Sequence, residues 1–234
     1  MCENMKKKLL IMLVLVFALA GCGKKDSEQV NENKEPDKVV ENEEVTESTQ
    51  EEQNVETAKQ TVEKVFENLK TLNFKEAEKN INVEEIKQYI STELTYMDAE
   101  EFMNEWFDTL DCEIVSAENV DDSNVSVSVK ITSRDMKELL LKHNEAIDTY
   151  VEDNIDMLYA YSQAQRAELI QSKSTELFGE CVKNEEYTSI TSSVTLNISN
   201  TEGTWILSVD NDLRNALLGD LTGAKEALGF TVAQ

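Results

Sequence analysis

The spacing of apolar residues changes along the chain and divides it into helical and extended segments. Around 58–72, large apolar residues recur every three or four positions with charged residues between them, which predicts an amphipathic helix. The same spacing predicts a short helix over 83–90 and another over 98–110. Asp98 is suited to cap this third helix, with Glu101 three residues on as its capping-box partner.

Strict alternation of apolar and polar residues predicts strands. From 125 to 131, Val and Ile alternate with Ser and Lys, which is typical of an antiparallel strand with one buried and one solvated face. Three further strands are expected: a short run at 114–115, one at about 187–198, and one at 204–209. A hairpin turn at 200–203 joins the last two.

A long helical stretch separates these strands, at about 134–182, and contains no proline. Its apolar stripe runs from Met136 to Tyr161 and resumes through Leu169 to Phe178. The pattern predicts one or two long helices packed on the sheet or on each other.

A final helix is expected after Asp210 or Asn211, either of which can cap it, and it continues to Leu221. The order of elements therefore predicts a single α+β domain over 57–234. We expect a curved antiparallel sheet wrapped around the N-terminal helix, with the stretch 134–182 as an extra helical insertion.

The first residues have the pattern of a secretory signal. Lys6, Lys7 and Lys8 precede twelve uninterrupted apolar residues over 9–20, and small residues follow. A membrane-spanning helix needs about 18–20 apolar residues, so this run is too short to span. Met5 begins an equally good signal and is an alternative start to Met1.

The tetrad Leu19-Ala20-Gly21-Cys22 resembles the lipobox of bacterial lipoproteins. The resemblance implies a signal peptide over 1–21, cleavage between Gly21 and Cys22, and a diacylglyceryl group on the Cys22 thiol. The expected location is the extracytoplasmic face of the cell membrane, with the covalent lipid as the membrane contact. Two or three acyl chains anchor a protein durably, whereas one does not.

Residues 22–56 are rich in Glu, Asn, Gln, Ser and Thr and poor in large apolar groups. Such a composition predicts a disordered acidic tether behind the lipidated cysteine. Removal of 1–21, which holds three lysines and one glutamate, changes the net charge from −25 to −27. A charge of this sign argues against nucleic acid as a partner, because phosphates would be repelled.

Three motifs of the folded region are similar to uncharacterised lipoproteins of Gram-positive Firmicutes: the Val-Phe-x-x-Leu run at 65–69, the strand pair 193–198 and 203–207, and the closing segment 210–219. Those lipoproteins contain domains of the nuclear transport factor 2-like (cystatin-like) superfamily. The resemblance covers about 57–220 and implies a cone-shaped fold. Members range from enzymes to binding modules, so the fold does not settle the function.

Few residues are candidates for chemistry. His143 is the only histidine, and its place in a helical apolar stripe favours a satisfied structural residue over a general base. Cys112 and Cys181 are a candidate disulfide in an extracytoplasmic protein, with two independent buried thiols as the alternative. The acidic pairs near 121 and 210 lack the spacing of a calcium loop and are better explained as turn and cap residues.

Aromatic residues are the candidates for a ligand pocket. Phe102, Trp106 and Trp205 could line a cavity inside the cone, although their spacing is also what core packing requires. No catalytic, cofactor or metal signature accompanies them. We therefore expect a non-enzymatic module that binds a small hydrophobic ligand, a cell-wall component or a protein partner. The alternatives are a cryptic small-molecule enzyme that uses a cone cavity, and a structural envelope protein that self-associates, for example as a homodimer.

Overall fold

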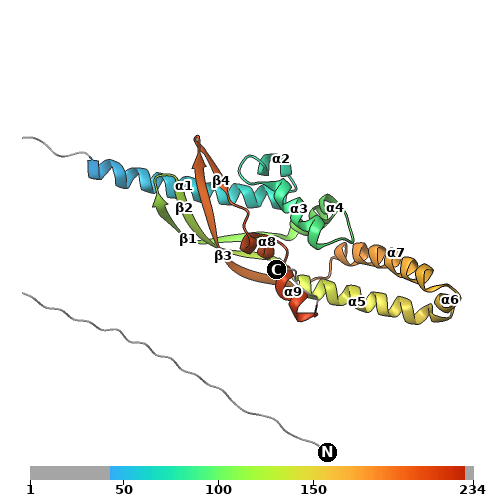
Figure 1. Ribbon diagram of the computed structural model, residues 1–234. Coiled ribbons are helices and arrows are strands. Elements are labelled where there is room, and N and C mark those ends of the chain that lie inside the picture. The colour runs from blue at the N-terminus through green and yellow to red at the C-terminus, as the bar shows by residue number, and fades with distance from the viewer. Residues whose placement is uncertain (1–42, 230–234) are drawn as a thin grey trace, which may run out of the picture. The chain divides into compact units, whose positions relative to one another are not determined.

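The alternating residues after 124 form one inner strand of a four-stranded antiparallel sheet (Figure 1). The structure is a computed structural model that describes residues 43–229. The strands follow the spatial order β1-β2-β3-β4, with these bounds: β1 Asp111–Asp121, β2 Asn124–Arg134, β3 Ser189–Thr201 and β4 Thr204–Leu207. The predicted α+β class and antiparallel sheet are therefore confirmed.

The two faces of the sheet differ as the alternation predicts. Val127 of β2 lies opposite Leu196 of β3, and Val129 lies opposite Val194, all four buried. The residues between them on β2 are serines and a lysine that reach solvent. Helices α1 and α8 pack on the sheet. The apolar face of the sheet therefore belongs to the core, and its polar face is exposed to water.

The helices of the described residues have these bounds: α1 Glu43–Lys70, α2 Phe74–Ala77, α3 Val83–Glu93, α4 Ala99–Trp106, α5 Met136–Asp153, α6 Ile155–Tyr159, α7 Gln163–Val182, α8 Asn211–Leu217 and α9 Leu221–Ala227. A short 3₁₀ turn, Phe107–Thr109, follows α4. Asp98 caps α4 by accepting from the backbone N–H groups of Glu100 and Glu101, and Asp210 caps α8. Both caps are confirmed, since a carboxylate satisfies N–H groups that have no partner inside the helix. The predicted capping box is not formed, because the Glu101 carboxylate pairs with Lys183 at 3.0 Å.

Helix α1 begins at Glu43, so residues 43–56, which were predicted as part of the tether, are helical. Asn54 is buried, and its Nδ2 donates to the backbone oxygen of Asp122 at 3.2 Å. Residues 43–56 have good helix formers but few apolar groups, so composition alone suggested disorder. Contact with the turn between β1 and β2 supplies the interaction that composition did not reveal.

The predicted final helix is divided in two. Gly219 has a φ of +62° and the next residue, Asp220, has a φ of +59°, so the helical path stops after α8 and resumes as α9. A side chain at 219 would overlap the carbonyl oxygen of Arg134. Gly219 also accepts a 3.1 Å hydrogen bond from the N–H of Met136, which joins this turn to the start of α5.

The predicted helical insertion is two long helices, α5 and α7, joined through the short α6. They pack against each other as an antiparallel hairpin, shown in yellow and orange in Figure 1, that extends away from the sheet. Asp135 caps α5, and Ser162 caps α7 through a capping box with Gln165. Strand β2 continues to Arg134, so the helical segment begins at Met136.

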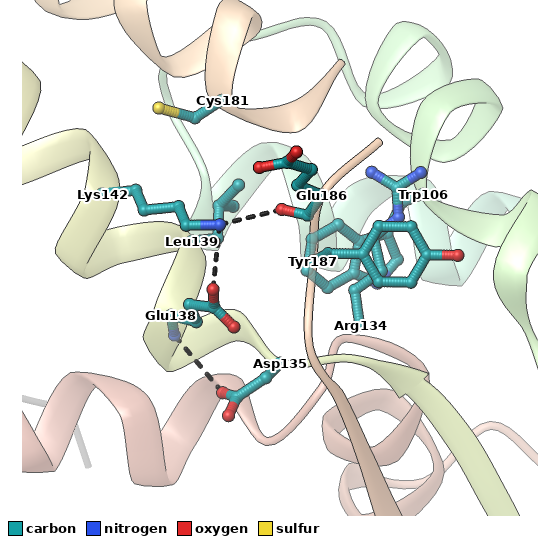
Figure 2. Close-up of a pocket in the computed structure, with 9 residues that line it drawn as sticks. All are labelled: Trp106, Arg134, Asp135, Glu138, Leu139, Lys142, Cys181, Glu186 and Tyr187. Carbon is teal, nitrogen blue, oxygen red and sulfur yellow. Dashed lines mark hydrogen bonds and ion pairs between the residues drawn. The ribbon is translucent and has the colours of Figure 1, made fainter. Parts of the chain in front are cut away.

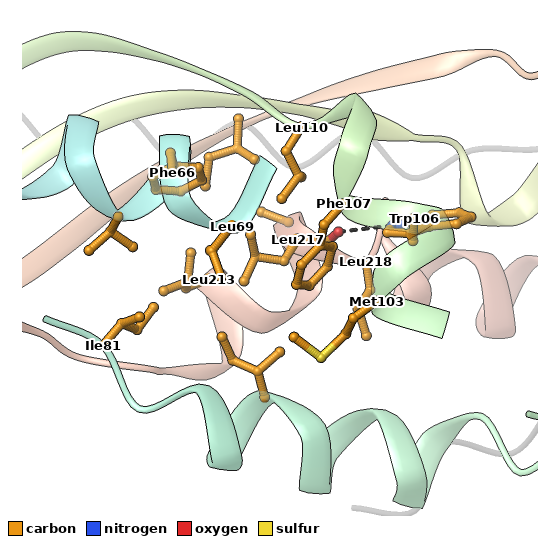
Figure 3. Close-up of a cluster of buried hydrophobic side chains, with 14 of the residues drawn as sticks. Phe66, Leu69, Ile81, Met103, Trp106, Phe107, Leu110, Leu213, Leu217 and Leu218 are labelled. Carbon is orange, nitrogen blue, oxygen red and sulfur yellow. Dashed lines mark hydrogen bonds between the residues drawn. The ribbon is translucent and has the colours of Figure 1, made fainter. Parts of the chain in front are cut away.

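The core lies between the sheet, α1, α3, α4 and α8 (Figure 3). Phe107 and Leu217 are fully buried near Leu69 of α1. The indole Nε1 of Trp106 donates to the backbone oxygen of Leu217 at 3.0 Å, which satisfies the polar atom of an otherwise apolar side chain. No helix within residues 43–229 is sufficiently long and apolar to cross a membrane.

Candidate functional site

The three aromatic residues proposed to line a pocket are part of the core instead. Phe102 and Trp106 are fully buried and stack with ring centroids 5.2 Å apart. Trp205 is 7% exposed and lies on β4, opposite Asn200 of β3. All three side chains are therefore buried in the core, where Phe102 and Trp106 stack on each other, and Trp106 also borders the small cavity described next.

A small cavity lies where the helical hairpin meets the sheet (Figure 2). Its volume is about 20 Å³, which is room for about one water molecule. It is lined by Trp106, Arg134, Asp135, Glu138, Leu139, Lys142, Cys181, Glu186 and Tyr187. A cavity of this size does not fit a small hydrophobic ligand.

Arg134 is the central side chain of this junction. Its guanidinium carbon lies 4.3 Å from the ring centroid of Tyr187 and 5.9 Å from that of Trp106. Nη1 donates to the backbone oxygen of Val182 at 2.6 Å, and Nη2 to Asp108 at 3.4 Å. Its Nε is buried without a protein partner, so the adjoining cavity lies where a single water molecule could complete its hydrogen bonding.

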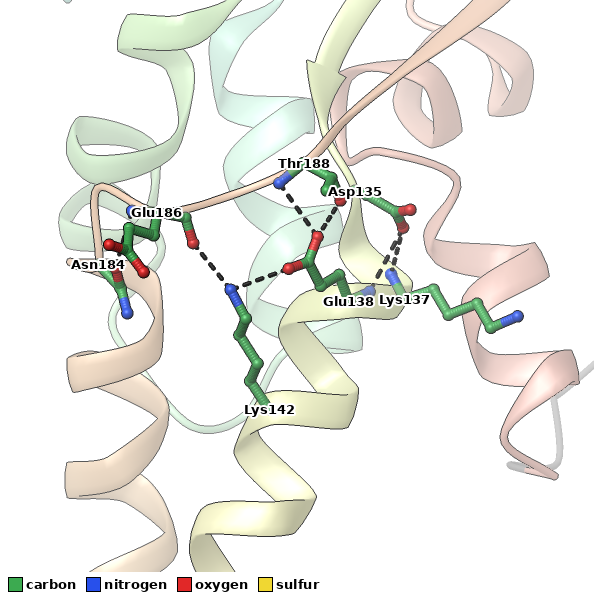
Figure 4. Close-up of polar contacts among 7 residues, drawn as sticks. All are labelled: Asp135, Lys137, Glu138, Lys142, Asn184, Glu186 and Thr188. Atoms are coloured by element: carbon green, nitrogen blue, oxygen red, sulfur yellow. Dashed lines mark hydrogen bonds and ion pairs between the residues drawn. The ribbon is translucent and has the colours of Figure 1, made fainter.

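Polar contacts fasten the start of α5 to the segment before β3 (Figure 4). Lys142 Nζ lies 2.8 Å from Glu138 and donates to the backbone oxygen of Glu186 at 2.8 Å. Glu138 also accepts from the backbone N–H of Thr188 at 3.0 Å and from its hydroxyl. The hydrogen bond from Lys142 lowers the pKa of the Glu138 carboxyl, and the contact with Thr188 lowers it further. Glu138, Lys142, Glu186 and Thr188 are called the hairpin clamp below.

His143 is a structural residue of the hairpin, as its position in the apolar stripe suggests. It is 2% exposed, and its Nε2 lies 2.9 Å from the backbone oxygen of Ser174 on α7. The rings of Tyr96 and Phe178 approach it edge to face. Burial lowers the pKa of the imidazole, which keeps it neutral and suits it to packing between α5 and α7.

The candidate disulfide is not formed in the structure, where Cys112 and Cys181 are free thiols. Cys112 lies on β1 beside Phe66 of α1, whereas Cys181 lies on α7 at the cavity of Figure 2. Burial raises the pKa of Cys112 to about 12 and also raises the pKa of Cys181. Each cysteine lies near the start of a strand in the sequence, which made them a candidate pair. In the structure Cys112 is close to α1, whereas Cys181 is part of α7.

Four large apolar side chains are exposed at the outer end of the helical hairpin, and one of them, Tyr161, belongs to the predicted apolar stripe. Tyr159 is 71% exposed, and Ile155, Met157 and Tyr161 are each at least 40% exposed. Leu158, between them, is buried and fixes α6 against the hairpin. Ile155, Met157, Tyr159 and Tyr161 are called the hairpin tip below. The predicted stripe included Tyr161 as a packed residue, which is wrong because Tyr161 lies in the bend between α6 and α7 and is 41% exposed.

The segment that contains the hairpin tip is rich in acidic residues. Residues 145–168 contain six carboxylates and one base, Arg166: Glu145, Asp148, Glu152, Asp153, Asp156 and Glu168. None of the six forms an ion pair with another side chain among residues 50–229, the range whose side chains the structure describes. The Arg166 guanidinium instead lies over the ring of Tyr159, 5.6 Å from its centroid.

The remaining acidic candidates have local structural roles. Asp121 accepts from the backbone N–H of Ser123 at 2.8 Å and from Asn124, as expected for a turn residue, and Asp210 caps α8. The backbone hydrogen bond from Ser123 lowers the pKa of Asp121. Within the described residues, no group of three or more His, Cys, Asp or Glu is placed to hold a metal ion.

Two larger clefts open to solvent. One of about 600 Å³ lies between the start of α4 and α7, with Asp98 and Glu180 among its lining residues. The other, about 450 Å³, lies between α3, α8 and α9 and includes Tyr89 and Lys225. Neither contains a residue that the sequence analysis proposed for a pocket.

Comparisons with known proteins found no matching family model, curated protein or solved structure. Cys22 and Gly21, the residues assigned to lipidation and cleavage, lie outside the described residues.

Proposed function

We propose that this chain is a lipid-anchored, extracytoplasmic, non-enzymatic lipoprotein that binds a protein partner through its hairpin tip. The observation that carries the proposal is the exposure of Ile155, Met157, Tyr159 and Tyr161 within seven residues at the end of the hairpin. Grouped apolar side chains on a protein surface mark interaction sites far more often than apolar residues scattered singly.

The residue types at the tip support this proposal. Tyr159 and Tyr161 combine a large apolar ring with a hydroxyl, and tyrosine is among the residues that dominate the free energy of protein interfaces. Met157 is flexible and adapts to irregular surfaces. Leu158 packs inward and holds α6, which carries Ile155, Met157 and Tyr159, whereas Tyr161 lies in the bend between α6 and α7.

The attachment of the base of the hairpin to the sheet also supports binding at its outer end. Arg134 and the hairpin clamp join the base of α5 and α7 to the sheet by hydrogen bonds, ion pairs and stacking. A surface that is held in place before binding loses less conformational entropy when the partner arrives.

Lipid anchoring belongs to the proposal on the grounds of the N-terminal sequence. The lysine cluster, the apolar run 9–20 and the Leu-Ala-Gly-Cys tetrad together resemble a lipoprotein signal. An anchor at Cys22 would leave the folded domain outside the membrane and the hairpin tip free to meet other surface proteins.

A nuclear transport factor 2-like cone is the fold that we propose, supported by the packing of α1 on an antiparallel sheet. The enzyme alternative requires a polar cavity inside that cone with an acid of raised pKa. Phe102 and Trp106 occupy the interior, and the carboxyl pKa shifts of Glu76, Asp121 and Glu138 are all downward. The geometry therefore supports binding over catalysis.

Site-specific photocrosslinking in cells tests the role of the tip. A photoreactive phenylalanine analogue at position 159 should give a discrete protein adduct, whereas the same analogue at Val115, an exposed apolar residue of β1, should not. Ile155→Ser with Met157→Ser should reduce the adduct at 159 by about ten-fold, because two apolar anchors are lost. Equal labelling at 159 and 115 would reject the tip as a binding surface.

Metabolic labelling with a radioactive fatty acid tests the anchor. The chain should incorporate label, and Cys22→Ser should abolish it while Cys2→Ser leaves it unchanged. Labelling that persists in Cys22→Ser contradicts the assignment.

A further inference from the structure

We infer that the partner of the hairpin tip is a protein surface on which an apolar depression is bordered by lysine or arginine side chains. The inference rests on the proposed function and specifies the chemistry of the partner. It is based on the charges that lie close to Ile155, Met157, Tyr159 and Tyr161 in the sequence and on where those charges lie along α5.

The first argument is the excess of negative charge without internal compensation. Six carboxylates and one arginine occupy 145–168, and within residues 50–229 these carboxylates have no ion-pair partner. Other acids on the same hairpin do have one: Glu138 pairs with Lys142, and Glu176 with Lys173. Within the same range Glu180, near the base of α7, also lacks an ion pair, but Glu152, Asp153 and Asp156 are the unpaired acids that lie within three residues of Ile155 or Met157 along the chain.

The second argument is the position of Glu152 and Asp153 in the last turn of α5. The C-terminal end of a helix carries partial negative charge, so carboxylates there are unfavourable and bases are favourable. This turn contains no base. The acids therefore act against the stability of the free hairpin, and a cationic group of a partner would relieve the repulsion.

The same charges disfavour two other occupants. A second copy of this chain would bring another acidic tip into contact with the first, and like charges facing each other across an interface oppose association. An anionic lipid surface is disfavoured for the same reason. A basic rim on a protein partner complements the tip, and an apolar depression receives its four exposed side chains.

The test uses the full chain in cells, with the photoreactive analogue at position 159 as the probe. Glu152→Gln with Asp153→Asn should reduce the adduct by about ten-fold, since close charge pairs across an interface contribute strongly. The control is Glu51→Gln with Glu52→Gln, which removes the same charge from exposed positions on α1. This control should leave the adduct within about two-fold.

Two further readouts separate a binding effect from a folding defect and identify the partner. In thermal unfolding of the purified chain, Glu152→Gln with Asp153→Asn should raise the melting temperature, because repulsion at the end of α5 is removed. Mass spectrometry of the adduct should locate the crosslink in a partner segment with a net positive charge.

The failures of the inference and of the proposed function are distinguishable. An adduct that is lost in Ile155→Ser with Met157→Ser but unchanged in Glu152→Gln with Asp153→Asn would overturn the basic partner and leave the tip as a binding surface. A crosslink to lipid, to a second copy of this chain or to an acidic segment would overturn the inference as well. The absence of any adduct specific to position 159 would overturn both.

Discussion

The guanidinium of Arg134 lies against the ring of Tyr187, with its central carbon 4.3 Å from the ring centroid. Arg134 ends β2, and Tyr187 lies in the segment that leads from α7 to β3, so this contact joins the two points where the hairpin leaves and re-enters the sheet. The same guanidinium donates to the backbone oxygen of Val182, near the end of α7. One side chain thereby connects both ends of the insertion.

Arg134→Lys should lower the free energy of unfolding by about 2–3 kcal/mol, because an ammonium cannot keep both the hydrogen bond to Val182 and the stacking in this buried place. Equilibrium urea denaturation measures the change. Arg166→Lys is the matched control, since Arg166 stacks on the exposed Tyr159 and its loss should cost less than about 0.5 kcal/mol. Similar losses in the two variants would contradict the central role of Arg134.

Gly219→Ala should destabilise the chain far more than Gly203→Ala. Both glycines have positive φ, +62° and +85°, so both substitutions strain the backbone by about 1–2 kcal/mol. A methyl group at 219 would also overlap the carbonyl oxygen of Arg134, whereas nothing lies within 4 Å at 203. We expect a total loss of about 3–5 kcal/mol for Gly219→Ala, measured by urea denaturation. Equal effects would show that the turn at 219 is not held against β2.

His143 should make the stability of the chain depend on pH below its ordinary pKa of 6.5. Because burial lowers its pKa in the folded state, the unfolded chain binds the proton more readily. The stabilising contribution is therefore complete above pH 6.5 and decreases as the pH falls toward the folded pKa. Urea denaturation between about pH 7.5 and 5.5 should show a weaker decrease in His143→Gln than in the parent chain. Equal pH dependence in the two proteins would exclude this role.

Cys112 and Cys181 should react slowly with iodoacetamide in the folded chain, because burial raises both thiol pKa values and only the thiolate attacks. The measurement uses a chain with Cys2→Ser and Cys22→Ser, so that these two thiols are the only ones present. Mass spectrometry after unfolding without reductant should then show both residues alkylated. A chain that takes up label only after reduction would establish the disulfide and contradict the structure.

Much of the fold could be read from local patterns. The alternation around Val127 and Val129 is a direct consequence of the two-residue repeat of a strand, and it correctly assigned the buried face of the sheet. Asp98 and Asp210 were recognisable as caps because their effect depends only on N–H groups two or three residues away. Interactions between residues that are close together in the chain can therefore be predicted from the sequence.

The candidate site depended on contacts that have no such signature. Phe102 and Trp106 looked suitable for lining a pocket, but whether an aromatic side chain lines a cavity or fills one depends on every element around it. Tyr161 and Phe178 belong to the same predicted apolar stripe, yet Tyr161 lies exposed in the bend between α6 and α7, whereas Phe178 is buried against the rings of Tyr96 and Phe102. The period of the apolar residues identifies the apolar face of a helix. It does not show at which residue the elements that cover this face end.

The sequence by itself determined the strands, the caps, the class of fold and the residues that resemble a lipoprotein signal, since each depends on neighbours along the chain. Only the tertiary structure decided that α1 begins at Glu43, that Gly219 divides the final helix, and that Arg134 joins both ends of the hairpin. These features arise where segments distant in sequence approach within a few ångströms. At such contacts the partner segment determines how deeply a group is buried and how much space it has. The local sequence does not contain that partner.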